Sequence, residues 1–265
     1  GAVTGTAPPN STVEIFSSGD EEGRTFEAAV TADGGGSFSW AGTPGGPYVT
    51  ATATDGDNNT SEFSSFRVLG ALTVTTASDD GEGSLRRALQ DADGSSGPDT
   101  VVFRIPQTDP GYNSDTGVWT IEIFTPLHIN QESVYVDGTS QAAFMGEDMN
   151  DDGPEIRIIP ADDVPQYSFY LKGGHAVIDH FAIHGFPGSQ IRVSSDSNRV
   201  RSCYLGCGID GRTFTGSDEG VYVHAGNGNI IGGSEAGRNI IGGLHTYSDG
   251  ISLEAASGYT TISYN

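Results

Sequence analysis

The sequence predicts an all-β protein in which a small β-sandwich is followed by a right-handed parallel β-helix, or solenoid, with one short capping helix. Short aliphatic segments recur at regular spacing in the second half of the chain, with glycine-rich corners between them. Strand-like segments and turns alternate in the first seventy residues, and only one stretch has a helical apolar pattern. Gly occurs 39 times and only 35% of residues are hydrophobic, which favours many turns and thin cores.

Residues 1–70 make up the predicted sandwich. Several short segments with alternating apolar and polar residues are separated by clusters of Gly, Pro, Asn and Asp. Turns between short strands, one about every ten residues, are typical of a small sandwich. We expect Phe38 and Trp40 to contribute to its core.

Residues 71–265 make up the predicted β-helix, which we expect to be incomplete at its C-terminal end. Aliphatic triplets begin at Ile191, Val221 and Ile251, 30 residues apart. Such self-similarity indicates a solenoid, and its parallel crossovers should be right-handed. The last residues, 259–265, form one more rung without a cap, so we expect the stack to continue in further chain or in another subunit.

Asparagines precede several aliphatic segments of this region, and stacked coils would align them in a ladder at one corner. The asparagines concerned are Asn198, Asn229 and Asn239. The one predicted helix begins after Ser84, a good N-cap residue, and ends at Gly94. It would cover the first rung of the stack, since its apolar residues fall on one face.

The first unit resembles the small bacterial immunoglobulin-like domains of large surface proteins. The resemblance depends on residues 3–9, 13–16 and 23–26, and most of all on residues 48–55 and 59–64. It implies a spacer or adhesive module that carries no catalytic residues.

The second unit resembles the β-helices of a group of bacterial surface proteins named for a C-S-L-R-E-A signature. Residues 73–76, 80–89, 97–106 and 136–141 carry this resemblance, which covers about residues 72–265. Gly83 and Arg87 occupy the first and fifth signature positions, so this sequence is a variant of the pattern.

The charge is strongly acidic, with 35 Asp and Glu against 12 Lys and Arg and a net charge of −23. Nucleic acid and anionic membranes are therefore excluded as expected partners, because both would be repelled. No apolar run is long enough for membrane insertion. The acidic surface is explained by solubility, by a high-salt (halophilic) habitat, or by binding of divalent cations.

One motif predicts a calcium site. The residues Asp148, Asn150 and Asp152, followed by Gly153, reproduce the first half of an EF-hand-type loop. The acid usually found at position twelve is replaced by Ile159, so the predicted Ca²⁺ ligands are Asp148, Asn150, Asp152 and Glu155. Asp162 or Asp163 are alternatives to Glu155, and a solvated acidic loop is the alternative to a metal site.

Other polar groups point to no clear chemistry. The oxygen-rich segment from Asp55 to Glu62 is better explained as a hairpin turn than as a chelating loop. Cys203 and Cys207 are either a local pair or two buried apolar residues. The six histidines lie in a strand pattern or at corners, and zinc is disfavoured. They are His128, His175, His180, His184, His224 and His245.

No catalytic residues are predicted, because the aspartates of the β-helix are scattered. These are Asp179, Asp196, Asp210, Asp218 and Asp249. We predict an extracellular or cell-surface structural or adhesive module of a large surface or filament protein. Its expected partners are other copies of itself, neighbouring surface modules and glycans.

The alternative is a carbohydrate-active β-helix, either a polysaccharide lyase or hydrolase or the glycan-binding part of one. Basic residues of the β-helix would then meet an acidic polysaccharide. The candidates are Lys172, Arg192, Arg199 and Arg201. A third hypothesis is a calcium-regulated, ice-binding or glycan-binding module.

Overall fold

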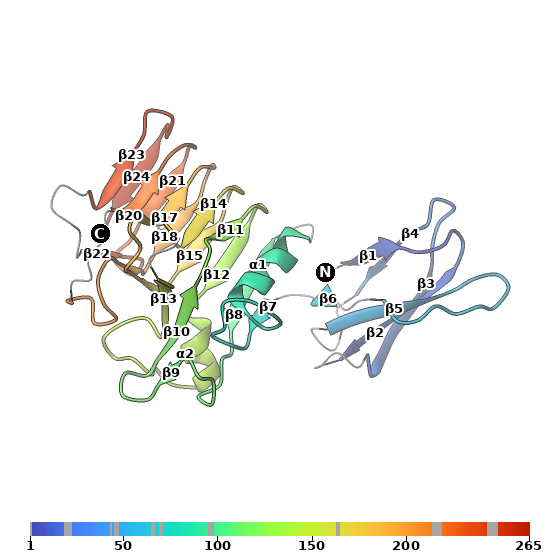
Figure 1. Ribbon diagram of the computed structural model, residues 1–265. Coiled ribbons are helices and arrows are strands. Elements are labelled where there is room, and N and C mark those ends of the chain that lie inside the picture. Colours follow the sequence, from blue (N-terminus) through green and yellow to red (C-terminus); the bar gives the residue numbers. More distant parts are fainter. Residues whose placement is uncertain are drawn as a thin grey trace. The chain divides into compact units, whose positions relative to one another are not determined.

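The computed structural model describes residues 2–18, 23–42, 44, 48–64, 67–68, 71–94, 98–162, 165–213, 219–242 and 249–265. The chain divides into two compact units, Gly1–Ala71 and Leu72–Asn265 (Figure 1). Strands dominate both units, which confirms the all-β class.

Two antiparallel sheets form the first unit. The strands are β1 (Ala2–Thr6), β2 (Thr12–Ser18), β3 (Thr25–Thr31), β4 (Ser37–Ala41), β5 (Tyr48–Thr54) and β6 (Arg67–Val68). One sheet has the order β3-β2-β5-β6 and the other pairs β1 with β4. Val13 and Ile15 of β2 are buried, and Phe38 and Trp40 of β4 pack against them, so the two sheets share one core.

Three sheets form the second unit, in the part of it that the structure describes. The five-stranded sheet contains β11 (Leu127–Ile129), β14 (Phe169–Leu171), β17 (Ser189–Val193), β20 (Glu219–Val223) and β23 (Ile251–Leu253). The six-stranded sheet contains β9 (Tyr112–Asn113), β10 (Val118–Ile123), β13 (Ile156–Pro160), β16 (Ala182–Ile183), β19 (Tyr204–Leu205) and β22 (Ile240–Ile241). The seven-stranded sheet contains β7 (Ala71–Val74), β8 (Asp99–Phe103), β12 (Val134–Asp137), β15 (Val177–Asp179), β18 (Arg199–Arg201), β21 (Asn229–Gly232) and β24 (Thr260–Ser263).

The chain visits these sheets in a fixed cycle. From β10 to β24 it passes through the six-, five- and seven-stranded sheets in turn. Each strand therefore pairs in parallel with the strand three places further along, as β11 with β14 and β14 with β17. We call one pass of the chain through the three sheets a coil. The strands of successive coils are neighbours within each sheet, and Figure 1 shows them as a stacked series.

The core lies between the three sheets. Side chains alternate between the inside and the outside along each strand, and the register aligns the inward ones in rows. One such row is Val136, Ile178 and Val200, all fully buried. Three buried phenylalanines also stack edge to face, because Phe181 lies 5.5 Å from Phe103 and 5.9 Å from Phe169, measured between ring centroids.

Two helices accompany the sheets, in the described residues. The predicted helix is confirmed as α1 (Leu85–Asp93), where the Ser84 hydroxyl accepts the N–H of Arg87 at 3.1 Å and the apolar face is buried. The second helix, α2 (Ser140–Met145), was not predicted because six residues are too short for a helical pattern. Buried Gln141 of α2 bonds both the N–H and the carbonyl of Ile105, each at 2.9 Å.

The prediction of a single asparagine ladder is wrong for Asn239, which does not stack with Asn198 and Asn229. Buried Asn198 donates through both its backbone N–H and its side-chain amide to Oδ1 of Asn229, at 2.9 and 3.0 Å. Asn239 lies at another corner, where its amide donates to Oδ1 of Asn265 at 2.7 Å. An asparagine that precedes an aliphatic segment thus occurs at two different corners. The asparagines form two separate stacks, one at each corner.

Candidate functional site

The predicted calcium loop is held by its own hydrogen bonds. Asp148 Oδ1 accepts the N–H of Asn150 at 3.0 Å, and Oδ1 of Asn150 accepts the N–H of Asp152 at 3.4 Å. The amide of Asn150 donates to the carbonyl of Pro154 at 3.1 Å and to that of Ile209 at 3.4 Å. The loop therefore bridges two later parts of the chain through Asn150, which is buried.

Glu155 has a different environment. Its side chain is buried, and its Oε2 lies 3.4 Å from Nε2 of His180. In the described residues, no three His, Cys, Asp or Glu side chains form a group that could hold a metal ion. Asp163, Asp218 and His245 lie outside the described residues.

A cleft of about 690 Å³ opens beside this loop. Three loops line it, residues 112–117, 148–152 and 208–213, together with Arg157 of β13 and His184, which follows β16. Arg157 is fixed by two donations to Oγ1 of Thr120, at 3.0 and 2.7 Å. Five aspartates line the same cleft, so it holds more acidic than basic side chains. They are Asp115, Asp148, Asp151, Asp152 and Asp210.

The histidine of this cleft is neutral at physiological pH. Burial lowers the pKa of His184 to about 4, and the charge of Arg157 acts in the same direction. The unfolded chain binds the proton near the ordinary pKa of about 6.5, so stability is full above that pH and is lost as the pH falls towards 4. His184 is thus a weak base that remains available as an uncharged hydrogen-bonding group.

We expect this titration to appear in the stability of the protein. Between pH 6.5 and pH 5, His184 should cost the native state on the order of 2 kcal/mol of unfolding free energy. His184→Gln should remove that part of the pH dependence in urea unfolding curves, whereas His175→Gln, at an exposed position, should leave it unchanged. Parallel pH profiles for His184→Gln and the unaltered protein would contradict the assignment.

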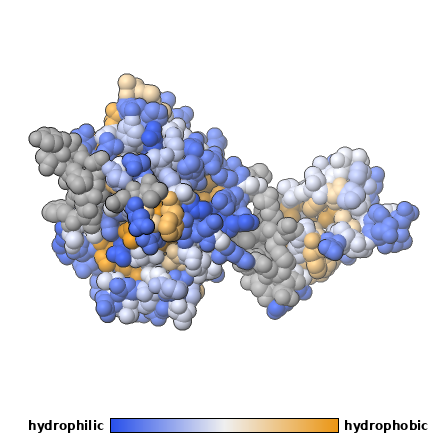
Figure 2. Space-filling model, in the orientation of Figure 1, coloured by the Kyte–Doolittle hydropathy of each residue, from blue (hydrophilic) through white to orange (hydrophobic). Residues whose placement is uncertain are grey.

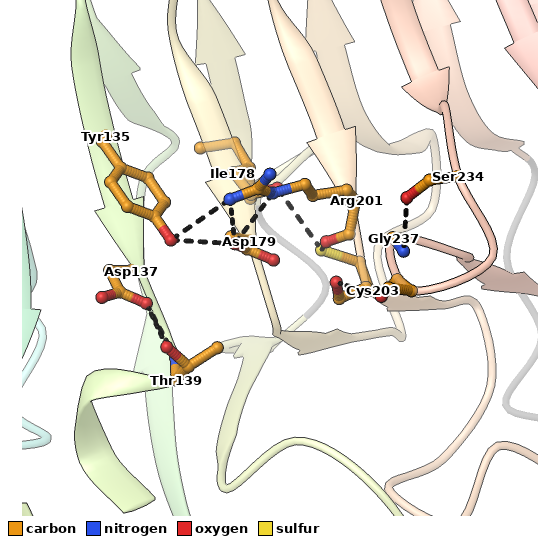
Figure 3. Close-up of polar contacts among 11 residues, drawn as sticks. Tyr135, Asp137, Thr139, Ile178, Asp179, Arg201, Cys203, Ser234 and Gly237 are labelled. Atoms are coloured by element: carbon orange, nitrogen blue, oxygen red, sulfur yellow. Dashed lines mark hydrogen bonds and ion pairs between the residues drawn. The ribbon is translucent and has the colours of Figure 1, made fainter. Parts of the chain in front are cut away.

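A second polar cluster lies on the seven-stranded sheet. Tyr135, Asp179 and Arg201 come from β12, β15 and β18, and their side chains point towards one another (Figure 3). Asp179 Oδ2 accepts the Tyr135 hydroxyl at 2.9 Å and Nε of Arg201 at 2.9 Å. The expectation that the aspartates of the β-helix are merely scattered is wrong for Asp179, because the register aligns it with Asp137 and Arg201 on neighbouring coils.

The protonation of this cluster limits its chemistry. Burial, and next the hydrogen bond to Asp179, raise the pKa of Tyr135 to about 12. Although burial acts in the opposite direction, the bonds to Tyr135 and Asp179 raise the pKa of Arg201. Tyr135 and Arg201 therefore keep their protons near neutral pH, and both donate to Asp179.

The two cysteines are free and buried. Burial raises the pKa of Cys203 to about 12 and that of Cys207 to about 11. Their thiols are therefore protonated and unreactive at neutral pH. They behave as small apolar residues, which was one of the two expectations for them.

A third cluster covers the outer face of the five-stranded sheet, and we call it the tyrosine–arginine face. The parallel register aligns His128, Tyr170, Arg192 and Tyr222 across β11, β14, β17 and β20. Lys172 follows β14, and its Nζ lies 3.1 Å from Nδ1 of His128 and 4.8 Å from the centre of the Tyr170 ring. The face thus combines aromatic rings with cationic groups.

Sequence reasoning identified the cations of this face but missed its tyrosines. The sequence marks Arg192 and Lys172 as candidates for contact with an acidic polysaccharide, but Tyr170 and Tyr222 are not singled out. The middle residue of each aliphatic triplet points outward, because side chains alternate along a strand. Aromatic or basic residues at the middle position of successive triplets would have predicted the tyrosine–arginine face.

No protein-family model, curated protein or solved structure matches this chain. The described residues include no helix that is long and apolar enough to cross a membrane. The visible surface of the second unit is mostly hydrophilic, with smaller apolar areas (Figure 2), in line with the acidic composition.

Proposed function

We propose that this chain is an extracellular structural or adhesive module of a larger surface or filament protein. In this proposal the first unit is an immunoglobulin-like sandwich and the second is a right-handed parallel β-helix. The cycle of strands through three parallel sheets supports the β-helix, because a solenoid coil returns to each sheet once per turn. Its partners would be other copies of the chain or neighbouring surface modules.

The main support for this proposal is that ionisable side chains join neighbouring coils through hydrogen bonds and ion pairs. Asp179 of β15 bonds Tyr135 on the coil before it and Arg201 on the coil after it. Nδ1 of His224 lies 2.6 Å from Oε2 of Glu254 on the next coil. Groups committed to such contacts stabilise the stack, which supports a role in assembly and binding better than a role in turnover.

Sedimentation velocity over a wide range of concentrations tests the assembly. We expect weak, concentration-dependent self-association of the chain. A strictly monomeric chain at every concentration would contradict self-association.

Calcium binding is part of the same proposal, with Asp148, Asn150, Asp152 and Glu155 as its predicted ligands. Asp148, Asn150 and Asp152 line the cleft, which supports a role for this loop in ion binding, whereas Glu155 is buried beside His180. A ligand that binds the native state alone raises the melting temperature. We expect millimolar calcium to do so for the unaltered chain and not for Asp148→Ala, with Asp55→Ala as the acidic-loop control. Equal melting shifts in the unaltered chain and in Asp148→Ala would contradict this site.

A carbohydrate-active enzyme is the second candidate. The cleft that holds Arg157 and His184 favours it, since a guanidinium and a neutral imidazole together could bind a carboxylate and move a proton. The low pKa of His184 makes it a weak base, which is why this candidate comes second.

A further inference from the structure

The tyrosine–arginine face concentrates positive charge in a strongly acidic chain. The chain has 12 Lys and Arg residues against 35 Asp and Glu, and its one lysine, Lys172, lies on this face. Arg192 lies on β17, and Lys172 directly follows the neighbouring strand β14. Burial lowers the pKa of His128 on β11, so this histidine adds no charge at neutral pH. A polyanion that the rest of the surface repels would be attracted here.

Arg192 lacks the carboxylate partner that an arginine usually has in such a protein. Its guanidinium carbon lies 5.1 Å from the centre of the Tyr222 ring, 5.2 Å from that of Tyr170 and 5.7 Å from that of Tyr167. Its Nε is buried without a hydrogen-bond partner, and no carboxylate in the described part of the chain lies within ion-pair distance. The arginine is therefore positioned by aromatic rings and forms no direct ion pair, although its charge helps to lower the pKa of Glu254.

Two glutamates lie at one end of this positively charged region and bound it there. Oε1 of Glu219 accepts the hydroxyl of Ser252 at 2.7 Å, and Glu254 contacts both Tyr222 and His224. Both acids lie on β20 or after β23, at one end of the face. An anionic ligand would consequently bind over β11, β14 and β17 rather than over the whole sheet.

We propose that this face binds an acidic polysaccharide of uronic-acid units. A uronate carboxylate would pair with the guanidinium of Arg192 and with Nζ of Lys172, replacing the missing partner. The apolar faces of the sugar rings would pack on Tyr167 and Tyr170. Strands repeat at about 4.8 Å, which is close to the length of one sugar unit in an extended chain, so successive units can follow successive coils.

The charge of the whole protein favours this ligand over a nucleic acid. Nucleic acid has a much denser negative charge, about one per 1.7 Å of duplex, and the acidic surface would repel it more strongly. This inference rests on the proposed function in one respect, since an extracellular module would meet such polysaccharides.

Isothermal titration calorimetry with polygalacturonate and alginate tests the proposal. Fully methyl-esterified polygalacturonate is the matched ligand control, because it keeps the sugar chain and removes the charge. We expect binding to the two acidic polymers, at least about tenfold weaker binding to the esterified one, and a loss of affinity at high salt. Equal binding of the acidic and esterified polymers, or no binding of either acidic polymer, would overturn the proposal.

Variants locate the site. Arg192→Gln and Tyr170→Ala should each weaken binding about tenfold, and Lys172→Gln, at an exposed position, about threefold. Arg199→Gln, an exposed arginine of the seven-stranded sheet, is the control and should bind normally. Unchanged binding by Arg192→Gln and Lys172→Gln, or tighter binding of single-stranded DNA than of either acidic polymer, would overturn the proposal. Self-association, measured separately, should be the same in all these variants, so a failure here is distinguishable from a failure of the proposed function.

Discussion

Replacing Phe181 with alanine should lower the free energy of unfolding of the second unit by about 3–5 kcal/mol. Phe181 is fully buried and packs edge to face against both Phe103 and Phe169. Its removal leaves a cavity between side chains of β8 and β14, and the close-packed strands around it can relax only in part to fill it. Urea unfolding followed by the fluorescence of Trp119 measures the change, in a Trp40→Phe background that leaves Trp119 as the only tryptophan.

Phe124→Ala is the matched control. Phe124 lies in the same unit, but 56% of its surface is exposed. We expect its loss to change the unfolding free energy by no more than about 0.5 kcal/mol. Equal destabilisation by the two substitutions would show that Phe181 is not part of a close-packed core.

Asn198→Ala should destabilise the second unit by about 3 kcal/mol, because several buried hydrogen bonds depend on this one side chain. Oδ1 of Asn198 accepts the N–H of Ala176 at 3.0 Å, and its amide donates to the carbonyl of Ser195 at 2.9 Å and to Asn229 at 3.0 Å. Without it, the N–H of buried Ala176 loses its acceptor, and an unpaired buried N–H is costly. Thermal unfolding followed by circular dichroism measures the effect.

The neighbouring residue supplies the control for this substitution. Arg199 lies on the same coil, but it is exposed, so Arg199→Ala should be nearly neutral. If Asn198→Ala is as mild as Arg199→Ala, the asparagine ladder does not hold the corner together.

The sequence was sufficient to predict the strands and the helix because their signals are local. Side chains alternate along a strand, so triplets such as that beginning at Ile191 identify both the strand and its buried residues. Ser84 and the apolar face after it likewise identified α1, and the structure confirms that helix. These features depend only on residues within a few positions of one another.

The partners of the polar side chains could not be predicted in the same way. Asp179 bonds Tyr135, which lies 44 residues earlier, and Arg201, which lies 22 residues later. The asparagine pair Asn198 and Asn229 spans 31 residues. Coils of unequal length shift the register between neighbours, so a fixed repeat does not tell which polar residues align. For the same reason, the rings that surround Arg192 were missed.

The calcium prediction illustrates another limit of sequence reasoning. The spacing of Asp148, Asn150 and Asp152 matches a ligand pattern, yet the same residue types also form turns. In the structure Asp148 and Asn150 accept backbone N–H groups of their own loop. Spacing alone does not distinguish a loop that binds an ion from one that is held by such bonds.

Incubation with acidic polysaccharides distinguishes the proposed binding module from an enzyme that turns over a substrate. Released reducing ends and the ultraviolet absorbance of unsaturated uronates should be measured together with retention of the protein on the same polymers. We expect retention without any product, at every pH and with or without calcium. Product formation that is abolished in Tyr135→Phe or in His184→Gln would contradict this expectation and would identify an enzyme.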